Sequence, residues 1–346
     1  MGISKVNNMK RFIFLIIILL PCSVFAGSFS KVGTAAAQFL KIGVGAKAMG
    51  MGGSFTAIAN DVSSIYWNPA GIANLDRTSI GFTHTEWFAD ISHDFLGVVV
   101  PISSSDFIGV QAITLNTAEQ EVTTVANPDG TGIFYDVRDL AIGLSYTRQL
   151  TDRFSVGLTA KYVMQNLYNV QASSLTLDIG SYLRTGFHNL TIGMAISNFG
   201  GTMQLDGRDL ITIADVNSSF SGNYNPDARL TTQEYPLPLI FRVGLAMDFV
   251  GGNDPVIQSD DYRFTLATEG THLNDNEERF NIGGECSWTE TVFVRAGYKF
   301  NYDTEKWALG VGVNIPVGNQ KVVFDYAFIG FENLGNVSQF SLELRL

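Results

Sequence analysis

Few residues of this chain have both the type and the spacing that chemistry requires. Two neighbouring serines at 63–64 carry hydroxyl groups, but the sequence shows no general base that would activate them as nucleophiles. The histidines fall on four separate segments and form no short metal-binding motif such as His-Glu-x-x-His. The sequence therefore predicts no catalytic residue, no metal site and no enzyme activity. The four histidines are His84, His93, His188 and His272.

The glycines Gly50, Gly52 and Gly53 resemble the beginning of a dinucleotide-binding loop. Such a loop functions between a strand and a helix of a parallel βαβ unit, and no such unit follows in this sequence. Glycine also permits two backbones to approach closely and allows a positive φ angle. We favour this packing role, and the sequence predicts no cofactor.

The composition argues against nucleic acid as a partner and differs from that of a soluble domain. The 346 residues carry a net charge of -11, whereas nucleic-acid binding needs a basic face. Only 16% of the residues are charged, below the roughly 25% of soluble domains. No apolar run after Ala26 has the length of a membrane helix. The apolar residues must therefore follow another pattern, and nucleic acid is not expected as a partner.

Residues 1–26 have the features of a signal peptide. Two basic residues, Lys10 and Arg11, precede an apolar run at 12–20, and cleavage is expected after Ala26. Cleavage removes one of the two cysteines, so that no disulfide within the mature chain is expected. The sequence thus predicts export from the cytoplasm.

Strict alternation of apolar with small or polar residues dominates the chain after residue 77. In one such run, Leu140, Ile142, Leu144 and Tyr146 alternate with small or polar residues. A period of two over eight or more residues indicates strands with two unlike faces. Fourteen segments of this kind are found, near 78–88, 91–102, 105–116, 137–150, 152–166, 172–185, 188–199, 236–250, 260–271, 278–288, 291–301, 306–316, 319–329 and 337–346.

The second face of these strands distinguishes a soluble sheet from a membrane barrel. It consists mainly of Gly, Ala, Ser and Thr with isolated charges of both signs. In a membrane barrel the large apolar residues face lipid, and small or polar residues face the lumen, where opposite charges can pair. We therefore predict an all-β fold, a transmembrane antiparallel up-and-down β-barrel of about 14 strands in the outer membrane of a Gram-negative-type bacterium, surrounded by outer-membrane lipid. The expected lumen charges are Lys161, Asp178, Arg242, Arg263, Glu285, Arg295 and Asp325.

The links between the strands alternate in length. Short links at 151–152 and 289–290 alternate with long ones at 117–136 and 200–235, as expected for short periplasmic turns and long external loops. The link at 251–259 does not fit, because it is long on the expected periplasmic side. The acidic link 200–235 is either a solvated loop or a surface on which a partner docks.

The segment 27–77 lies between the signal peptide and the first strand. Its part at 43–73 is rich in glycine and alanine and almost uncharged, whereas exposed loops are normally polar. We therefore expect 27–77 to form an N-terminal plug, or hatch, inside a barrel formed by 78–346. Asn68-Pro69 within it is interpreted as a turn, with the tip of a movable hatch as the alternative. The plug motif comprises Gly45, Gly50, Gly52, Gly53, Asn60, Asp61, Trp67, Asn68, Pro69 and Ala70.

Three stretches are similar to a known family: AQFLKI at 37–42, GAKAMGMG at 45–52 and YWNPA at 66–70. They resemble the PorV/PorQ family of outer-membrane barrels, which looks like a branch of the FadL transporters of fatty acids and hydrocarbons. The resemblance implies fourteen strands and an N-terminal hatch, in agreement with the alternation.

For function, the resemblance implies two different roles. PorV-like proteins act with the type IX secretion machinery and hold exported proteins at the outer membrane. The start at 37–42 favours this branch, so the leading hypothesis is a binding component for protein export, with secretion machinery or exported proteins as partners. The alternative is passive FadL-like transport of a hydrophobic ligand. A third hypothesis is a barrel that only scaffolds other envelope proteins.

Two local expectations follow from the assigned faces. Gly157 faces the lumen and is expected to tolerate serine. Aromatic residues near strand ends are expected to form the interfacial girdle of a membrane barrel. These aromatic residues are Trp87, Phe88, Trp288, Tyr298, Phe300 and Trp307.

Overall fold

A computed structural model describes residues 32–214, 226–252 and 254–346 of the chain. The chain divides into two units, Met1–Ser30 and Lys31–Leu346, and the description concerns the second unit. The expected signal peptide and the first residues of the expected plug lie outside the described residues.

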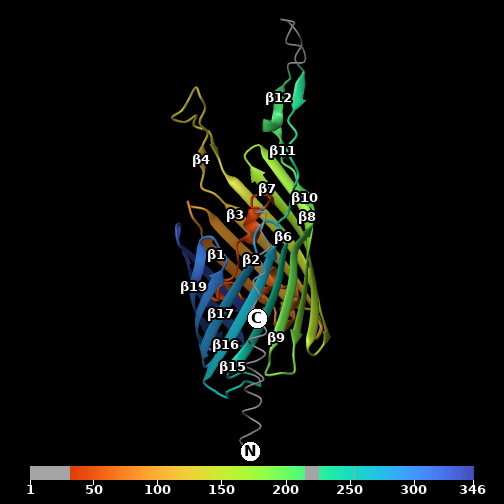
Figure 1. Cartoon of the computed structure of the whole chain (residues 1–346), viewed down its shortest axis with the longest axis vertical. Helices are drawn as coiled ribbons and strands as arrows, with labels where there is room; N and C mark the ends of the chain where they lie inside the picture. Colours follow the sequence, from red (N-terminus) through yellow and green to blue (C-terminus); the bar gives the residue numbers. More distant parts are fainter. Residues whose placement is uncertain (1–31, 215–225, 253) are drawn as a thin grey trace, which may run out of the picture. The chain divides into compact units, whose positions relative to one another are not determined.

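Fourteen long strands form a closed antiparallel barrel (Figure 1). Each long strand pairs with the next one along the chain, and the first pairs with the last, from Ser79 opposite Arg345 to Glu86 opposite Ser338. The predicted fourteen-stranded barrel is therefore confirmed. Its strands are β1 (Ser79–Glu86), β2 (Ser92–Pro101), β3 (Asp106–Asn116), β6 (Val137–Thr151), β7 (Phe154–Leu167), β8 (Val170–Arg184), β9 (Thr191–Gly200), β15 (Ile240–Val250), β16 (Tyr262–Leu273), β17 (Arg279–Trp288), β18 (Val292–Phe300), β19 (Glu305–Val317), β20 (Gln320–Phe331) and β21 (Gly335–Arg345).

Burial alternates along the strands as the sequence pattern predicts. On β7, Leu158 and Tyr162 are exposed on the outside, while Thr159 and Lys161 are buried inside. Successive side chains of a strand point to opposite faces, so the period of two separates an apolar outer face from a polar inner face. An apolar outer face with a polar interior is the arrangement of a membrane barrel.

The two ends of the barrel differ. One end, the loop end, carries the long links after β3 and β9, which rise beyond the long strands in Figure 1. The opposite end carries the beginning of β1 and the last residues of β21. The links at the loop end contain the short elements β4 (Gln120–Glu121), β5 (Phe134–Tyr135), β10 (Thr202–Met203), β11 (Asp206–Gly207), η3 (Arg208–Leu210), β12 (Ile211–Ile213), β13 (Asp227–Arg229) and β14 (Tyr235–Pro236).

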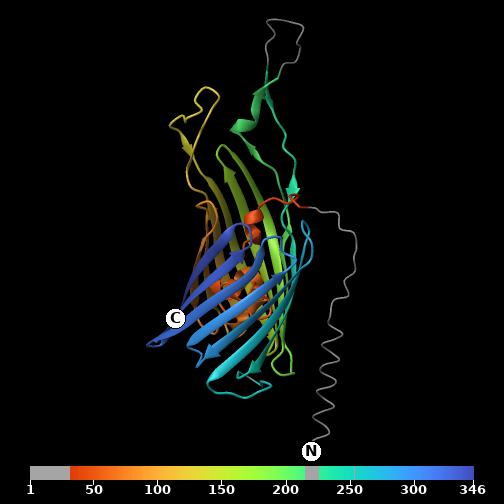
Figure 2. The same ribbon diagram turned by 60° about the vertical axis from the view of Figure 1, so that its left-hand side comes forward.

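Residues 34–78, which we call the internal segment, lie within the ring of strands (Figure 2). One part packs against β18 to β21, and another part packs against β3 and β6 to β8. None of the helices in the described part of the chain has the length and apolar character needed to cross a membrane. The helices of the internal segment are η1 (Gln38–Lys41), α2 (Ala46–Gly50), α3 (Ser64–Trp67) and η2 (Pro69–Asn74).

The expected outward position is wrong for two of the aromatic residues. Trp87 and Phe88 pack against Phe331, with ring centroids 5.5 and 4.9 Å from its ring, and both are partly buried against the interior cluster to which Phe331 belongs. They follow the last residue of β1, where the chain turns with positive φ angles at Ala89 and Asp90. Beyond the end of a strand, alternation no longer determines the face. The other four aromatic residues are exposed on the outside.

The outer face generates a first prediction. Leu144 is at the middle of β6 and 59% exposed. If lipid surrounds it, Leu144→Arg should lower the free energy of unfolding by about 2–4 kcal/mol, because a charge is then buried in hydrocarbon. Urea titrations in liposomes measure this. Val125→Arg, in the exposed loop after β4, is the matched control and should be neutral; equal effects would contradict the outward assignment.

Candidate functional site

Ten inward-facing glycines of the wall touch the internal segment. A Cβ atom built on any of them would lie 2.1 to 3.0 Å from an atom of that segment. Real Cβ atoms almost never come closer than 3.0 Å, as they would at seven of these positions, and the 3.0 Å at Gly109, Gly244 and Gly310 is tighter than most real contacts. Glycine therefore allows the wall and the segment to pack in this way. We call these residues the glycine belt: Gly81, Gly97, Gly109, Gly157, Gly180, Gly193, Gly244, Gly283, Gly297 and Gly310.

The expectation that Gly157 tolerates serine is wrong. A Cβ atom at this position would lie 2.5 Å from the backbone nitrogen of Ala70 and 2.7 Å from Oγ1 of Thr147. The sequence identifies Gly157 as inward-facing but does not show that another backbone occupies the space in front of it.

The four glycines of the plug motif lie at close contacts within the lumen. Gly45, with a φ of 88°, precedes α2 and faces the side chain of Ser63. Gly50 and Gly52 approach the backbone of β19 and β18, where a Cβ atom would lie 2.9 and 3.1 Å from the nearest wall atom. Gly53, with a φ of 77°, lies against the ring of Trp67.

The side chain of Asn68 connects three parts of the structure. Its Nδ2 donates to the carbonyl oxygens of Thr56 and Ser181, and its Oδ1 accepts from the backbone N–H of Ala70. Pro69 then opens η2, where a missing N–H is tolerated. The expected turn at Asn68-Pro69 is thus the beginning of a short 3-10 helix.

The remaining polar members of the motif bind within the segment or to the wall. Asn60 accepts from Nζ of Lys47, and its carbonyl oxygen accepts from Arg345. Asp61 accepts from the backbone N–H and the hydroxyl of Ser63 at 2.8 and 2.6 Å. Next to η2, the wall hydroxyls of Thr147 and Ser155 donate to the carbonyl oxygens of Pro69 and Ala70.

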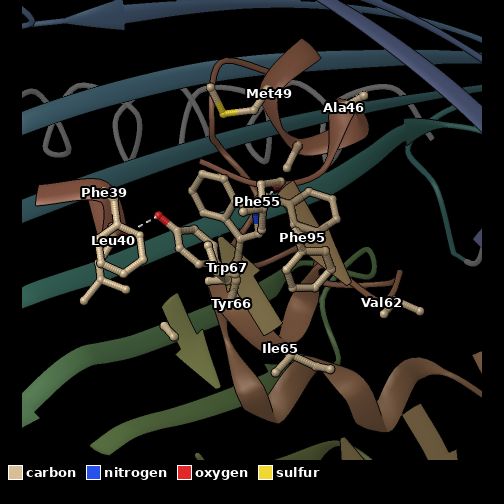
Figure 3. Close-up of a cluster of buried hydrophobic side chains, with 14 of the residues drawn as sticks. Phe39, Leu40, Ala46, Met49, Phe55, Val62, Ile65, Tyr66, Trp67 and Phe95 are labelled. Carbon is tan, nitrogen blue, oxygen red and sulfur yellow. Dashed lines mark hydrogen bonds between the residues drawn. The ribbon is translucent and has the colours of Figure 1, made fainter. Parts of the chain in front are cut away.

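Two aromatic residues of α3 form the centre of the interior cluster (Figure 3). The rings of Tyr66 and Trp67 meet edge to face at 5.2 Å, and Trp67 meets Phe55 at 6.3 Å. Both polar atoms are used: Trp67 donates to the carbonyl oxygen of Val44 and Tyr66 to that of Leu40. Burial raises the pKa of the Tyr66 hydroxyl, so that it remains a donor.

Four of the seven predicted lumen charges come together in one network. Glu285 accepts from Arg263 at 2.8 Å and from Arg295 at 2.6 Å, and Arg295 also donates to Asp325 at 2.6 Å. Lys47 of the internal segment is 3.9 Å from Glu285. Opposite charges compensate one another in this buried interior, where a lone charge would be costly.

The other three predicted charges form separate pairs. Lys161 and Asp178 pair at 2.8 Å, and both are buried. Arg242 is 3.8 Å from Glu269 and lies over the rings of Tyr66 and Trp67. Glu269 is absent from the predicted site although its inward position is visible in the alternation.

Two large cavities lie in the lumen. The loop-end cavity has a volume of about 260 Å³ and is bordered by the internal segment and strands β15 to β20. The opposite-end cavity has a volume of about 570 Å³ and is mainly polar. In its lining, burial acts to raise the pKa of Glu290, but the hydrogen bonds and charge of Arg263 outweigh burial and lower it.

Within the described ranges, no three His, Cys, Asp or Glu side chains are placed to hold a metal ion.

Solved structures with the same fold include two toluene transporters and a FadL homologue. The toluene transporter TbuX of Ralstonia pickettii aligns with a TM-score of 0.53 at 15% identity, covering 87% of this chain and 97% of that one. The toluene transporter TodX of Pseudomonas putida gives 0.56 at 12%, with 87% and 97% covered. A FadL homologue of Pseudomonas aeruginosa gives 0.50 at 12%, with 86% and 96% covered. This chain therefore has the FadL-like barrel fold.

By sequence, part of the chain is similar to an uncharacterised protein family. The family "Uncharacterised protein family (UPF0164)" matches residues 23–133. Two proteins of Treponema pallidum, each called "UPF0164 protein", are 25% and 23% identical over 210 and 168 residues, which are 55% and 46% of this chain. The matched regions span 53% and 52% of those relatives, about half their length.

The glycine belt generates a prediction. Gly297→Ala places a methyl group 2.1 Å from the backbone nitrogen of Gly52, so the free energy of unfolding should fall by about 1–3 kcal/mol through overpacking. Gly270→Ala, on β16 with open space around its Cβ position, is the control. Urea titration and protease protection of residues 34–78 measure both. Equal behaviour of the two variants would show that the segment does not press on the wall.

The buried network generates another prediction. Glu285→Gln leaves two arginines without their shared carboxylate, so the variant should lose about 3–5 kcal/mol of stability. Glu278→Gln removes an exposed partner of His272 and should change stability by less than about 1 kcal/mol. If both variants unfold at the same urea concentration, the network does not stabilise the lumen.

Proposed function

We propose that this chain is an outer-membrane barrel that passes small hydrophobic molecules, and that the internal segment is the plug of the passage. The observation that carries the proposal is the loop-end cavity, where the rings of Tyr66, Trp67 and Trp87 form one part of the lining and charged side chains, among them Arg242 and Lys299, form another. Binding sites for small molecules are concave, lined by apolar and aromatic groups, with a few polar atoms that fix orientation. A volume of about 260 Å³ suits a compact ligand.

Three polar atoms of this lining are available to a bound molecule. Nε of Arg279, Oδ1 of Asn281 and Oε1 of Glu269 are buried and have no hydrogen-bond partner among the residues that the structure describes. The solved relatives in fold are called toluene transporters and a FadL homologue. At 12–15% identity this likeness concerns the fold, so the ligand class rests on the cavity itself.

Uptake of radiolabelled toluene tests the proposal in a Gram-negative host without transporters of this class. Expression of the chain should raise uptake several-fold. Thr271→Trp fills the loop-end cavity and should abolish this gain, because Thr271 is inward-facing on its lining. Thr268→Trp, on the outer face of the same strand, is the matched control. Uptake equal to that of the empty host would refute transport of toluene.

Protein export of the PorV/PorQ type is the second hypothesis. The link between β9 and β15 at the loop end supports it, since Ile211 and Ile213 expose 53% and 68% of their surface there. Exposed apolar residues on a projecting loop can bind a protein partner. Pull-down from native membranes with wild type and with Ile211→Ser/Ile213→Ser tests this role: loss of a co-purified secretion component in the variant supports it, and identical partners in both contradict it.

A further inference from the structure

The two cavities lie on the same strands of the wall, one toward each end of the lumen. On β16, Glu269 lines the loop-end cavity and Thr265 lines the opposite-end cavity. A strand rises about 3.3 Å per residue, so these two positions are about 13 Å apart along the strand. Only one inward-facing position, that of Ala267, lies between them. A single layer therefore separates the two cavities.

Residues 51–57, which we call the barrier loop, form this layer. All seven are buried. The wall positions that face them are small, and the contact is between backbones: a Cβ atom at Gly283 would lie 2.2 Å from the carbonyl oxygen of Met51, and one at Gly244 would lie 3.0 Å from the nitrogen of Ala57. The barrier loop thus leaves no room along these strands, and any passage on this side requires that it moves.

Two wall side chains hold the barrier loop: the hydroxyl of Thr191 on β9 donates to the carbonyl oxygen of Ala57 at 2.9 Å, and the carboxylate of Glu269 on β16 accepts from two of its N–H groups. Oε2 of Glu269 accepts from the backbone N–H groups of Phe55 and Thr56 at 3.1 and 2.9 Å. Its other oxygen, Oε1, has no hydrogen-bond partner in the described part of the chain and is 3.8 Å from Nε of Arg242. Because Glu269 also lines the loop-end cavity, a molecule in that cavity meets one of the two wall side chains that hold the loop.

Two features of the barrier loop favour movement. The hydroxyl of Ser54 is buried without a hydrogen-bond partner among the described residues, which disfavours the closed arrangement. Gly52 and Gly53, at its start, have φ angles of 65° and 77°, where the backbone can reorient without a Cβ penalty. The polar groups around Asn68 are bound to β6, β7 and β8, and Nδ2 of Asn68 also donates to the carbonyl oxygen of Thr56 in the barrier loop.

We propose that Glu269 is a positioning residue that holds the barrier loop closed, and that movement of this loop joins the loop-end cavity to the opposite-end cavity. The proposal rests on the proposed transport function and adds its route. A molecule would leave the loop-end cavity, pass Gly244, Ala267 and Gly283, and enter the polar cavity at the opposite end.

Bilayer conductance of the full chain in potassium chloride tests the closing role without any ligand. Glu269→Ala removes the acceptor of two N–H groups and should raise the open fraction at least tenfold over wild type. Glu269→Gln keeps an amide oxygen in place and should restore most of the closure. Glu343→Ala is the matched control, because Glu343 also accepts a backbone N–H of the segment, that of Val62 at 3.1 Å, away from both large cavities.

The outcomes separate closure from general loosening. Equal leakage of Glu269→Ala and Glu343→Ala would overturn the proposal, as would no leakage of either in barrels that remain heat-resistant. A rise in the open fraction that is confined to Glu269→Ala supports the closing role of Glu269.

A reversible crosslink tests the route with toluene as the probe. A Cβ atom at Gly244 would lie 3.2 Å from that of Ala57, close to the roughly 3.8 Å of disulfides. Ala57→Cys/Gly244→Cys, in a chain with Cys286→Ser, should stop toluene uptake when oxidised and recover it with reductant. Each single-cysteine variant is a control, and Gly244→Cys alone measures what its added Cβ, 3.0 Å from the nitrogen of Ala57, does to uptake.

Saturation-transfer NMR of the purified protein with toluene distinguishes this proposal from the transport function. The oxidised double-cysteine protein should still bind toluene, because the loop-end cavity is intact. Continued uptake by the locked protein would refute the route while leaving transport in place. Absence of both binding and uptake in the wild type would refute transport itself, and the conductance of the Glu269 variants would still decide the closing role.

Discussion

Close contact between two backbones determines the interior of this protein. Ten wall glycines allow the internal segment to approach to distances at which a Cβ atom would collide or fit only tightly. Glycine in a strand weakens it, because no side chain packs and the unfolded chain has more freedom. This barrel accepts that cost at the inward positions of most of its strands. In return, the internal segment packs directly against the wall between the two cavities, with backbone atoms of the segment in contact with the inner face of the strands.

Charges then determine how the internal segment is oriented within this packing. Glycine contacts are tight but carry little direction, whereas the wall carboxylates accept particular N–H groups: Glu269 those of Phe55 and Thr56, and Glu343 that of Val62. Burial of a carboxylate is unfavourable unless it is paired and hydrogen-bonded. The segment therefore supplies donors that the wall charges need, and each stabilises the other. The charged residues that the sequence places on the inner face of the barrel therefore also hold the internal segment in position.

The sequence predicts the strands of the barrel far better than the contacts of the internal segment. Each strand meets two unlike surroundings, so residues such as Leu158 and Lys161 on β7 reveal their faces through a period of two. The internal segment has no such period, and its enclosure follows only from its apolar composition. Which residues meet across the lumen, such as Gly50 and Gly310, depends on tertiary packing that no local pattern encodes.

Two further differences have physical reasons. Trp87 lies beyond the end of a strand, where alternation no longer indicates a face. Gly157 is correctly assigned as inward, but its tolerance of serine depends on the occupant of the lumen, Ala70. The carboxylate of Glu269 can be assigned to the inner face from sequence, but its role in holding the barrier loop cannot.

The position of the internal segment in the chain has a consequence for the order of folding. The segment precedes β1, and the barrel closes where β1 pairs with β21, the first strand with the last. Once this seam is closed, the glycine contacts leave no path along which a folded segment can be threaded into the lumen. The segment must therefore collapse onto the inner face of an open, curved sheet, and the seam then forms around it. The N-terminal residues are thus a core on which the last step of barrel assembly is completed, even though they contribute no strand to the wall.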